Sequence, residues 1–296
     1  MEPEAGAGYL LCFEAMTGTR VLTALVLIPI VLAVVLLTPT WAVAIALAFI
    51  TILALWEYFA LGDAIGHRAY RFWTIFCALV LIFFQLLESF RGPFAVDVGG
   101  RVLPLAASLA SVFFLFVLGL TVLTLFTRRP LVESLPAAGI SSSALLLVAF
   151  PLSYAVRLHA VVPNGKWLLL FALAITWAAD TTAYFVGRAM GKHPLAPHIS
   201  PKKTWEGSIG GIVGSLIIGY VAKFFVPIPL VHLLAMAFVG NVAGQMGDLL
   251  ESAYKRSAGV KDSGSLLPGH GGVLDRIDAL ILCIPVVWYY LVLVGV

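Results

Sequence analysis

Apolar stretches of about 20 residues recur along this chain and constrain its fold more than any other feature. A helix needs about 20 apolar residues to cross a hydrocarbon core roughly 30 Å thick. Nine stretches reach this length, and they lie near 20–37, 41–61, 72–88, 102–126, 137–156, 167–187, 207–225, 230–250 and 273–295. The chain is 61% hydrophobic and 11% charged, with a mean hydropathy of +1.03, whereas soluble domains carry about 25% charge. We expect an all-α, polytopic integral membrane protein with about nine transmembrane helices.

The positions of lysine and arginine predict a cytoplasmic N-terminus. In that orientation thirteen of the eighteen Lys and Arg residues lie in inside segments and five lie in outside segments, as the positive-inside rule requires. Eight of the thirteen belong to two segments that also carry candidate site residues. Without those eight, the two sides of the membrane hold equal numbers, so a function in these segments would explain the asymmetry equally well.

The chain divides by character into an extension, a scaffold and a site-bearing region. Residues 1–19 form an N-terminal extension in which Met16 is a second candidate start. Residues 20–166 hold about five of the apolar stretches and few ionisable groups within them; the carboxylate of Glu57 has no evident role there. Residues 167–296 hold the other four stretches and seven of the fifteen carboxylates. We therefore expect the second half of the chain to carry the site.

Charged residues are densest between Ser252 and Asp278, in a chain that is otherwise poor in charge. The cations suit phosphate oxygens, and the glycines allow the backbone to approach a ligand closely. The alternative for the glycines is a turn that only connects two helices, and His270 is either a ligand contact or a plain loop residue. This segment indicates an anionic ligand. Its candidate residues are Ser252, Lys255, Arg256, Lys261, Asp262, His270, Gly271, Gly272 and Arg276.

Three aspartates in the same part of the chain are candidates for a metal site. Asp275 and Asp278 are three residues apart at the start of the last apolar stretch, and Asp248 ends the preceding one. Mg²⁺ prefers oxygen ligands, usually one or two carboxylates with substrate phosphates and water. No cluster of cysteine or histidine supports zinc, because the three cysteines are widely separated. We predict Mg²⁺ at Asp248, Asp275 and Asp278; the alternative for Asp248 is an ion pair with Lys255.

Two further motifs precede this segment. Asp180, Tyr184 and Arg188 recur every four residues and so share one helical face. The carboxylate of Asp180 would cost about 2.5–3.5 kcal/mol at full membrane depth unless it has a hydrogen-bond or ionic partner. Asp180 is therefore expected either to bind a ligand or to join two helices by a hydrogen bond. The second motif pairs lysines with hydroxyls in a loop, where they suit phosphate or anchor the chain at the membrane surface. Its candidate residues are Ser200, Lys202, Lys203 and Thr204.

Four glycines follow the second motif at small-residue spacing, at positions 207, 210, 211 and 214. Small residues at such intervals allow two membrane helices to approach closely. We interpret these glycines as structural and not as part of a ligand site.

The segment Ser252–Asp278 fits the pattern S-x-x-K-R-x4-K-D-x-G-x-x-L-P-x-H-G-G-x-x-D-R-x-D at every fixed position. It closely resembles the signature of the phosphatidate cytidylyltransferase, or CDP-diacylglycerol synthase, family. The segments Asp180–Gly187, Ser200–Gly207 and Gln245–Asp248 also look like blocks of that family, in the family's order. The first 160 residues resemble it only in hydropathy, apart from Arg20–Ala24.

The resemblance implies that CMP is transferred from CTP to phosphatidate, giving CDP-diacylglycerol and pyrophosphate. It implies Mg²⁺ at the three aspartates, a second cation such as K⁺ in the same cluster, and a homodimer. The lipid phosphate is already anionic and needs no covalent nucleophile, while the basic residues neutralise the two substrates. The expected partners are CTP, phosphatidate and membrane lipids, with no nucleic acid. The expected location is a bacterial cytoplasmic membrane, with the site facing the cytoplasm.

Three other classes of membrane protein compete with this interpretation. A phosphatidyltransferase that consumes CDP-diacylglycerol would carry a D-G-x2-A-R-x8-G-x3-D-x3-D pattern, which the sequence lacks. A cytidylyltransferase for an isoprenoid ether lipid phosphate would share the same motifs and differ only in its lipid pocket. A transporter would explain intramembrane aspartates and glycine-rich helices, but no paired halves are visible in the sequence.

Overall fold

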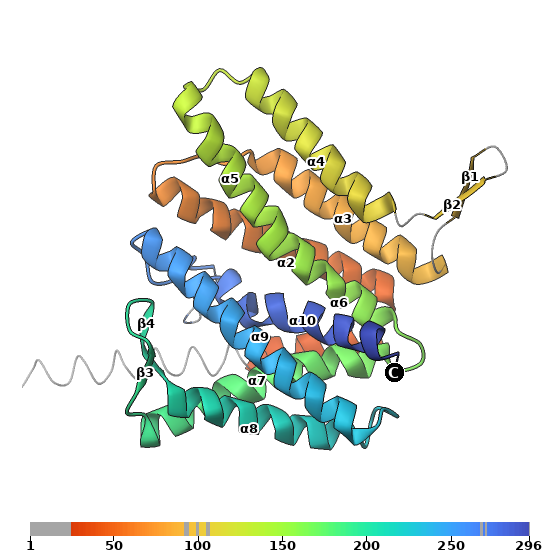
Figure 1. Ribbon diagram of the computed structural model, residues 1–296, viewed down its shortest axis with the longest axis vertical. Coiled ribbons are helices and arrows are strands. Elements are labelled where there is room, and N and C mark those ends of the chain that lie inside the picture. The colour runs from red at the N-terminus through yellow and green to blue at the C-terminus, as the bar shows by residue number, and fades with distance from the viewer. Residues whose placement is uncertain are drawn as a thin grey trace, which may run out of the picture.

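Helices dominate the structure, a computed structural model that describes residues 25–91, 95–98, 101–104, 107–266, 269 and 271–295 (Figure 1). The predicted extension 1–19 and the first residues of the first predicted stretch lie outside the described residues. The helices are α2 (Thr40–Ala64), α3 (Arg71–Arg91), α4 (Ala107–Leu125), α5 (Ser134–Ala144), α6 (Phe150–Ala160), α7 (Gly165–Met190), α8 (Trp205–Ala222), α9 (Leu230–Ser257) and α10 (Leu274–Val294). Two short antiparallel hairpins complete the fold, β1 (Ala95–Val98) with β2 (Arg101–Pro104) and β3 (Pro194–Ala196) with β4 (Ser200–Thr204).

Among the described residues, seven helical segments are long and apolar enough to cross a membrane. They are Thr40–Ala64, Arg71–Ser89, Leu131–Ala160, Gly165–Met190, Trp205–Ala222, Leu230–Ser257 and Leu274–Val294. The predicted class, an all-helical polytopic membrane protein, is confirmed. The other two predicted stretches correspond to the shorter apolar helices Leu25–Leu37 and Leu109–Leu125. The predicted number of about nine spans therefore stays a prediction, as does the cytoplasmic N-terminus.

The fourth predicted stretch, 102–126, begins differently from the expectation. Residues Arg101–Pro104 form strand β2 and pair with Ala95–Val98, so the helix starts only at Ala107. Pro104 helps to explain the shift, because proline donates no backbone hydrogen bond and disfavours helical geometry at the residue before it.

A proline also shapes the fifth stretch, which runs as one long helical segment from Leu131 to Ala160. A π-helical turn, η2 (Leu145–Ala149), joins α5 to α6, and Pro151 is the second residue of α6. Proline lacks the N–H that an α-helix would use at this point, and π-helical turns are a common local adjustment within α-helices. The helical segment therefore continues past Pro151 and covers the whole predicted stretch 137–156.

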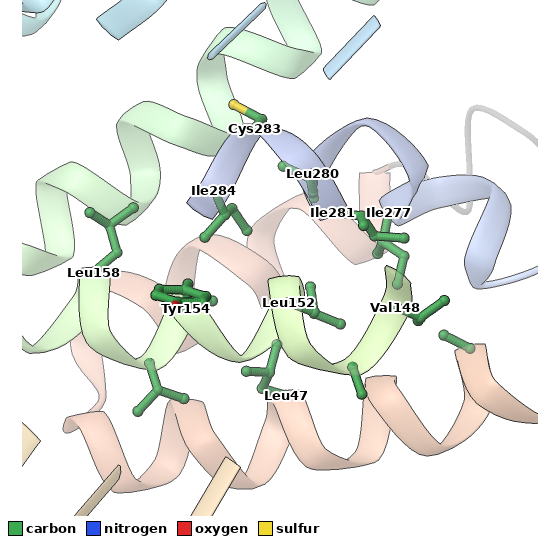
Figure 2. Packing of buried hydrophobic residues seen from close by; sticks show 14 of the residues in the cluster. Leu47, Val148, Leu152, Tyr154, Leu158, Ile277, Leu280, Ile281, Cys283 and Ile284 are labelled. Atoms are coloured by element: carbon green, nitrogen blue, oxygen red, sulfur yellow. The ribbon is translucent and has the colours of Figure 1, made fainter. Parts of the chain in front are cut away.

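The core lies where α6 packs between α2 and α10, as Figure 2 shows. Leu47 of α2, Leu152 of α6 and Ile284 of α10 point into this contact and are almost fully buried. Other large apolar side chains face outward, among them Phe49 and Phe114, at 62% and 70% exposure. Helices that are apolar on every side are typical of membrane spans, so these outward faces are suited to lipid.

The connections that carry the predicted site motifs gather at one end of the helices (Figure 1). The β3–β4 hairpin between α7 and α8, the α9–α10 connection and the α2–α3 turn all lie on the left in this view. Because successive long helices reverse direction, these three connections, which the sequence analysis assigned to the inside, reach the same end. The site motifs therefore share one end of the helix bundle.

Helices α7 and α8 pack closely because α8 presents glycines to α7. A Cβ atom added at Gly210 would lie 2.7 Å from Cβ of Val186, and one added at Gly214 would lie 2.3 Å from Oγ1 of Thr182. Both distances are too short for real atoms, so only glycine permits this approach. The glycines act as small helix-packing residues, as the sequence analysis interpreted them.

We expect Gly214→Ala to destabilise the protein by about 1–3 kcal/mol, because overpacking forces helices apart. A matched change, Gly139→Ala in α5, meets no atom within 4 Å and should instead stabilise by about 0.5–1 kcal/mol. Thermal unfolding of both variants in detergent measures the difference. Equal or higher stability of Gly214→Ala relative to wild type would contradict the packing argument.

Candidate active site

A close contact between α9 and α10 brings two of the predicted aspartates together. A Cβ atom added at Gly247 would lie 2.5 Å from the carbonyl oxygen of Asp278, so glycine is required where the two helices touch. Asp248 follows Gly247 directly, and its carboxylate interacts electrostatically with that of Asp278. Of the two aspartates that were predicted to face Asp248 from the start of the last helix, the structure therefore brings Asp278 to it.

Helix α7 adds Asp180 to the same group. Asp180 interacts electrostatically with Asp248, Lys203 and Arg276. A cavity of about 20 Å³ separates the helices here, which is room for roughly one water molecule or small ion. It is lined by Thr176, Ala179, Asp180, Asn241, Gly244, Gln245, Asp248 and Ala279.

The β3–β4 hairpin supplies a cation to this group. Nζ of Lys203 on β4 forms an ion pair with Oδ2 of Asp248, and both side chains are about one third exposed or less. The sequence analysis placed Lys203 in a loop, whereas the structure holds it on strand β4. This ion pair joins the Ser200–Gly207 motif to Asp248, the last residue of the Gln245–Asp248 motif.

Lys255 forms a second, more buried charged group beside the first. Its ammonium forms ion pairs with Glu251, one turn earlier on α9, and with Oδ1 of Asp275 at 2.6 Å. The side chain of Lys255 is only 11% exposed and that of Asp275 only 5%. Lys255 thus pairs with Glu251 and Asp275, and the alternative pairing with Asp248 is not the one that the structure records.

The carboxylate of Asp275 also organises the loop between α9 and α10. It accepts hydrogen bonds from the backbone N–H of Gly272 at 2.8 Å and of Ser263 at 3.0 Å, in addition to the Lys255 ammonium. A carboxylate has about four lone-pair sites, so these donors occupy most of its capacity. Asp275 therefore ties the loop to the start of α10.

A carboxylate from the scaffold reaches this loop as well. Glu57 of α2 is 7% exposed, and its oxygens accept hydrogen bonds from three donors of the second half of the chain. These are the backbone N–H of Val273 at 2.9 Å, the N–H of Leu274 at 2.8 Å and the Ser263 hydroxyl at 2.9 Å. The first N–H groups of a helix lack partners within it, so Glu57 satisfies the start of α10 from a different helix.

Several predicted substrate-binding residues have structural partners. Oγ1 of Thr204 accepts a hydrogen bond from the N–H of Gly207 at 3.1 Å and caps α8, as threonine commonly does at this position. The guanidinium of Arg256 donates to the carbonyl oxygens of Ile199 and Val260. Arg256 therefore holds the tip of the hairpin against the end of α9.

The remaining predicted residues differ in their contacts and in their exposure. The hydroxyl of Tyr184 accepts a hydrogen bond from Arg188 at 3.2 Å, and that of Ser252 lies 3.5 Å from Oδ1 of Asp248. Gly271 has a φ of +78°, which favours glycine. His270 lies outside the described residues. The side chains of Lys202, Lys261, Asp262 and Arg276 are exposed, Ser200 on β4 is half-buried, and Gly272 is buried.

The donor set can be compared with what Mg²⁺ requires. Among the described residues, no group of three or more His, Cys, Asp or Glu side chains is arranged to hold a metal ion. Asp248 and Asp278 nevertheless provide hard oxygen ligands side by side, which suits Mg²⁺ when substrate phosphates and water supply the rest. Asp275 fits less well, because Lys255 and two backbone N–H groups occupy its oxygens.

Three residues of this arrangement were given no role by the sequence analysis: Glu57, Glu251 and Ser263. The i, i+4 spacing of Glu251 and Lys255 is a local signal that could have revealed that ion pair. Glu57 had no local signal, because its partners lie 206 to 217 residues away. Such a contact depends on how α2 packs in three dimensions.

The fold and this charged group define a polytopic membrane protein whose polar site lies at one end of its helices. The sequence model of the Cytidylyltransferase family matches residues 18–294. A protein of Haemophilus influenzae named phosphatidate cytidylyltransferase is 36% identical over 293 residues, which covers 93% of this chain and 98% of that protein. Proteins of the same name from Bacillus subtilis and Staphylococcus haemolyticus are 38% and 49% identical over 58% and 43% of this chain, and over 66% and 50% of their own lengths.

The chain therefore belongs to the cytidylyltransferase family. The family resemblance stated from the motifs is confirmed, and so is the prediction that the chain is an enzyme of the nucleotidyltransferase class. The residues that carry its activity stay predictions.

We expect Lys255→Met to cost about 3–5 kcal/mol of stability, because it leaves two carboxylates, Glu251 and Asp275, buried without their cation. The exposed Lys192 offers a control of the same chemistry, and Lys192→Met should change stability by less than about 0.5 kcal/mol. Thermal unfolding in detergent compares the two variants. Equal melting temperatures for the two would show that the buried pair is not required.

Proposed function

We propose that this chain transfers CMP from CTP to phosphatidate and releases pyrophosphate. The membership in the cytidylyltransferase family and the names of its relatives support this reaction. The observation that carries the proposal to particular residues is the convergence of Asp180, Lys203, Asp248 and Asp278. Four separate motifs of the sequence contribute to this one group, at one end of a membrane-spanning bundle.

The basic residues around the aspartates would bind the phosphates of both substrates. Lys202 and Lys261 are exposed, and Lys203 lies beside Asp248. Ammonium groups are suited to phosphate oxygens. Transfer of a nucleotidyl group requires the anionic lipid phosphate to reach the α-phosphorus of CTP in line with the leaving pyrophosphate. The role of the protein is to place these groups and neutralise their charge.

Mg²⁺ is the proposed cofactor, with Asp248 and Asp278 as its first candidates for ligands and Asp275 as a third that the sequence predicts. When bound there, a divalent cation would neutralise charge on the nucleotide phosphates and on the departing pyrophosphate. A second cation such as K⁺ remains part of the proposal on family resemblance alone. Arg276 interacts electrostatically with Asp180 and would keep that carboxylate oriented.

The lipid would enter from the side of the bundle, with its acyl chains remaining in the membrane. Large apolar side chains face outward next to the site, namely Phe185 of α7, Trp205 of α8 and Met246 of α9, each at least 56% exposed. These surfaces suit acyl chains, while the phosphate reaches Lys203 and its neighbours. We propose a bacterial cytoplasmic membrane, a site facing the cytoplasm, and a homodimer, in line with the family resemblance.

We expect purified protein in detergent, supplied with radiolabelled CTP, phosphatidate and Mg²⁺, to form label that extracts with the lipid. Asp248→Asn and Asp278→Asn should lower the rate at least about 100-fold, because each removes a charge that acts on the reacting phosphates. Asp63→Asn is the control, since Asp63 pairs with Arg71 on the α2–α3 turn, and it should retain the wild-type rate.

Two outcomes of this assay would favour competing functions. Label formed only with an isoprenoid ether lipid phosphate would identify a different lipid substrate for the same chemistry. A folded wild-type sample that forms no labelled lipid with either substrate would overturn the cytidylyltransferase proposal. Uptake of an anion or metal by vesicles containing the protein would then indicate transport.

Metal removal should separate the candidate ligands from one another. EDTA should abolish the transfer, and Mg²⁺ added in excess should restore it. If Asp248 and Asp278 hold the metal and Asp275 mainly holds the loop, high Mg²⁺ should partly rescue Asp248→Asn and Asp278→Asn but not Asp275→Asn. Activity that persists in EDTA would contradict Mg²⁺ as the cofactor. Equal rescue of the three variants by Mg²⁺ would indicate that Asp275 is also a metal ligand.

A further inference from the structure

Glu57 makes a polar link between the scaffold half of the chain and the α9–α10 loop of the proposed active site. Glu57 belongs to α2, within residues 20–166, and its three hydrogen-bond donors belong to residues 263–274. That short segment also contains Gly271, Gly272 and the start of α10, from which Asp275 and Asp278 project. The position of Glu57 therefore bears directly on Asp275 and Asp278, which the proposed function names as candidate Mg²⁺ ligands.

Two glycines of the motif are explained by this carboxylate. A Cβ atom added at Gly264 would lie 2.6 Å from Oε1 of Glu57, and one added at Gly272 would lie 2.3 Å from Oε2. Neither space can hold a further carbon while Glu57 is in place. The loop is thus shaped around a side chain that lies outside the motif and is more than 200 residues distant in sequence.

The contact is supported by packing on both sides. Tyr58, the next residue of α2, makes an edge-to-face contact with Tyr254 of α9, with ring centroids 5.8 Å apart, and its hydroxyl donates to Ser143 at 2.9 Å. On the loop side, Ser263 uses its hydroxyl for Glu57 and its backbone N–H for Asp275. A continuous series of contacts therefore runs from Glu57 through Ser263 to Asp275 and Lys255.

We propose that Glu57 is a positioning residue for nucleotidyl transfer, which fixes the α9–α10 loop and the first turn of α10 in their active geometry. It acts through Ser263, Val273 and Leu274 and need not touch substrate. This inference deepens the proposed function and rests on it. It also gives the scaffold half of the chain a role in the reaction beyond membrane insertion.

The isosteric change Glu57→Gln is the sharpest test of this role. Oε1 serves the N–H of Val273, while Oε2 serves the N–H of Leu274 and the Ser263 hydroxyl. Glutamine has one acceptor oxygen and one donor NH₂ group. In either orientation of the amide, one backbone N–H at the start of α10 therefore faces another donor. The shape of the side chain is kept, while the negative charge and one acceptor oxygen are lost.

We expect Glu57→Gln to lower kcat/KM for CTP by about 10-fold to 100-fold, the size of effect that small misplacements of reacting groups produce. Backbone amide hydrogen exchange of residues 258–266, 269 and 271–275 in the α9–α10 loop should become faster at the same time. Glu88→Gln is the matched control, because Glu88 is a half-buried carboxylate of the scaffold that pairs with Arg157. It should leave kcat/KM and exchange of the loop unchanged in the folded enzyme.

A double-mutant cycle with Ser263→Ala tests whether the two side chains act together. If the hydroxyl works through Glu57, the double variant should be no worse than Glu57→Gln alone, because coupled residues are not additive. A role in stability alone would lower the melting temperature while kcat/KM per folded molecule stays at the wild-type value. That result, or an equal loss in Glu88→Gln, would overturn the proposal.

The result for the wild-type enzyme distinguishes failure of this inference from failure of the proposed function. If wild type forms no labelled lipid, the proposed reaction has failed, and the hydrogen-exchange comparison still tests whether Glu57 holds the loop. If wild type is active and Glu57→Gln has both normal kinetics and normal loop exchange, only the positioning role fails.

Discussion

Carboxylates near the apolar part of a membrane need partners, because an unpaired buried charge costs several kcal/mol. The second half of this chain brings several such carboxylates to one end of the bundle, and the structure pairs Asp248 with Lys203 and Asp275 with Lys255. These pairings determine how the β3–β4 hairpin lies on α9 and how the loop returns to α10. The arrangement of the proposed site follows from the need to neutralise these charges.

Close helix contacts make this pairing possible. Glycines of α8 allow α7 to approach, and Gly247 of α9 allows the backbone of α10 to approach at Asp278. Without these contacts the aspartates of α7, α9 and α10 would lie farther apart. Asp278 remains next to Asp248 and Asp180, so like charges are held together here. Such a group attracts a cation or the cationic groups of other segments, and this supports the proposed metal site.

The pairing also divides the predicted aspartates by role. The sequence treats Asp275 and Asp278 alike, since they lie three residues apart at the start of one helix. In the structure, Asp275 faces Lys255 and the loop, whereas Asp278 faces Asp248. Thr204 and Arg256 were likewise predicted to bind substrate, and their recorded partners are a helix N-terminus and two backbone carbonyls. Fixed spacing in sequence thus indicates that residues serve one site but not which task each performs.

The sequence by itself determined the membrane class, the helical fold, the family and most of the residues that meet at the proposed site, because hydropathy and motif spacing are local properties. Only the tertiary structure decided which charges pair, where β2 replaces a predicted helix end, and that Glu57 reaches the half of the chain that carries the proposed site. The partners of Glu57 lie more than 200 residues away, and a helix places its side chains by its packing against other helices. No local pattern around Glu57 records that packing, so its role appears only when α2 and α10 are seen together.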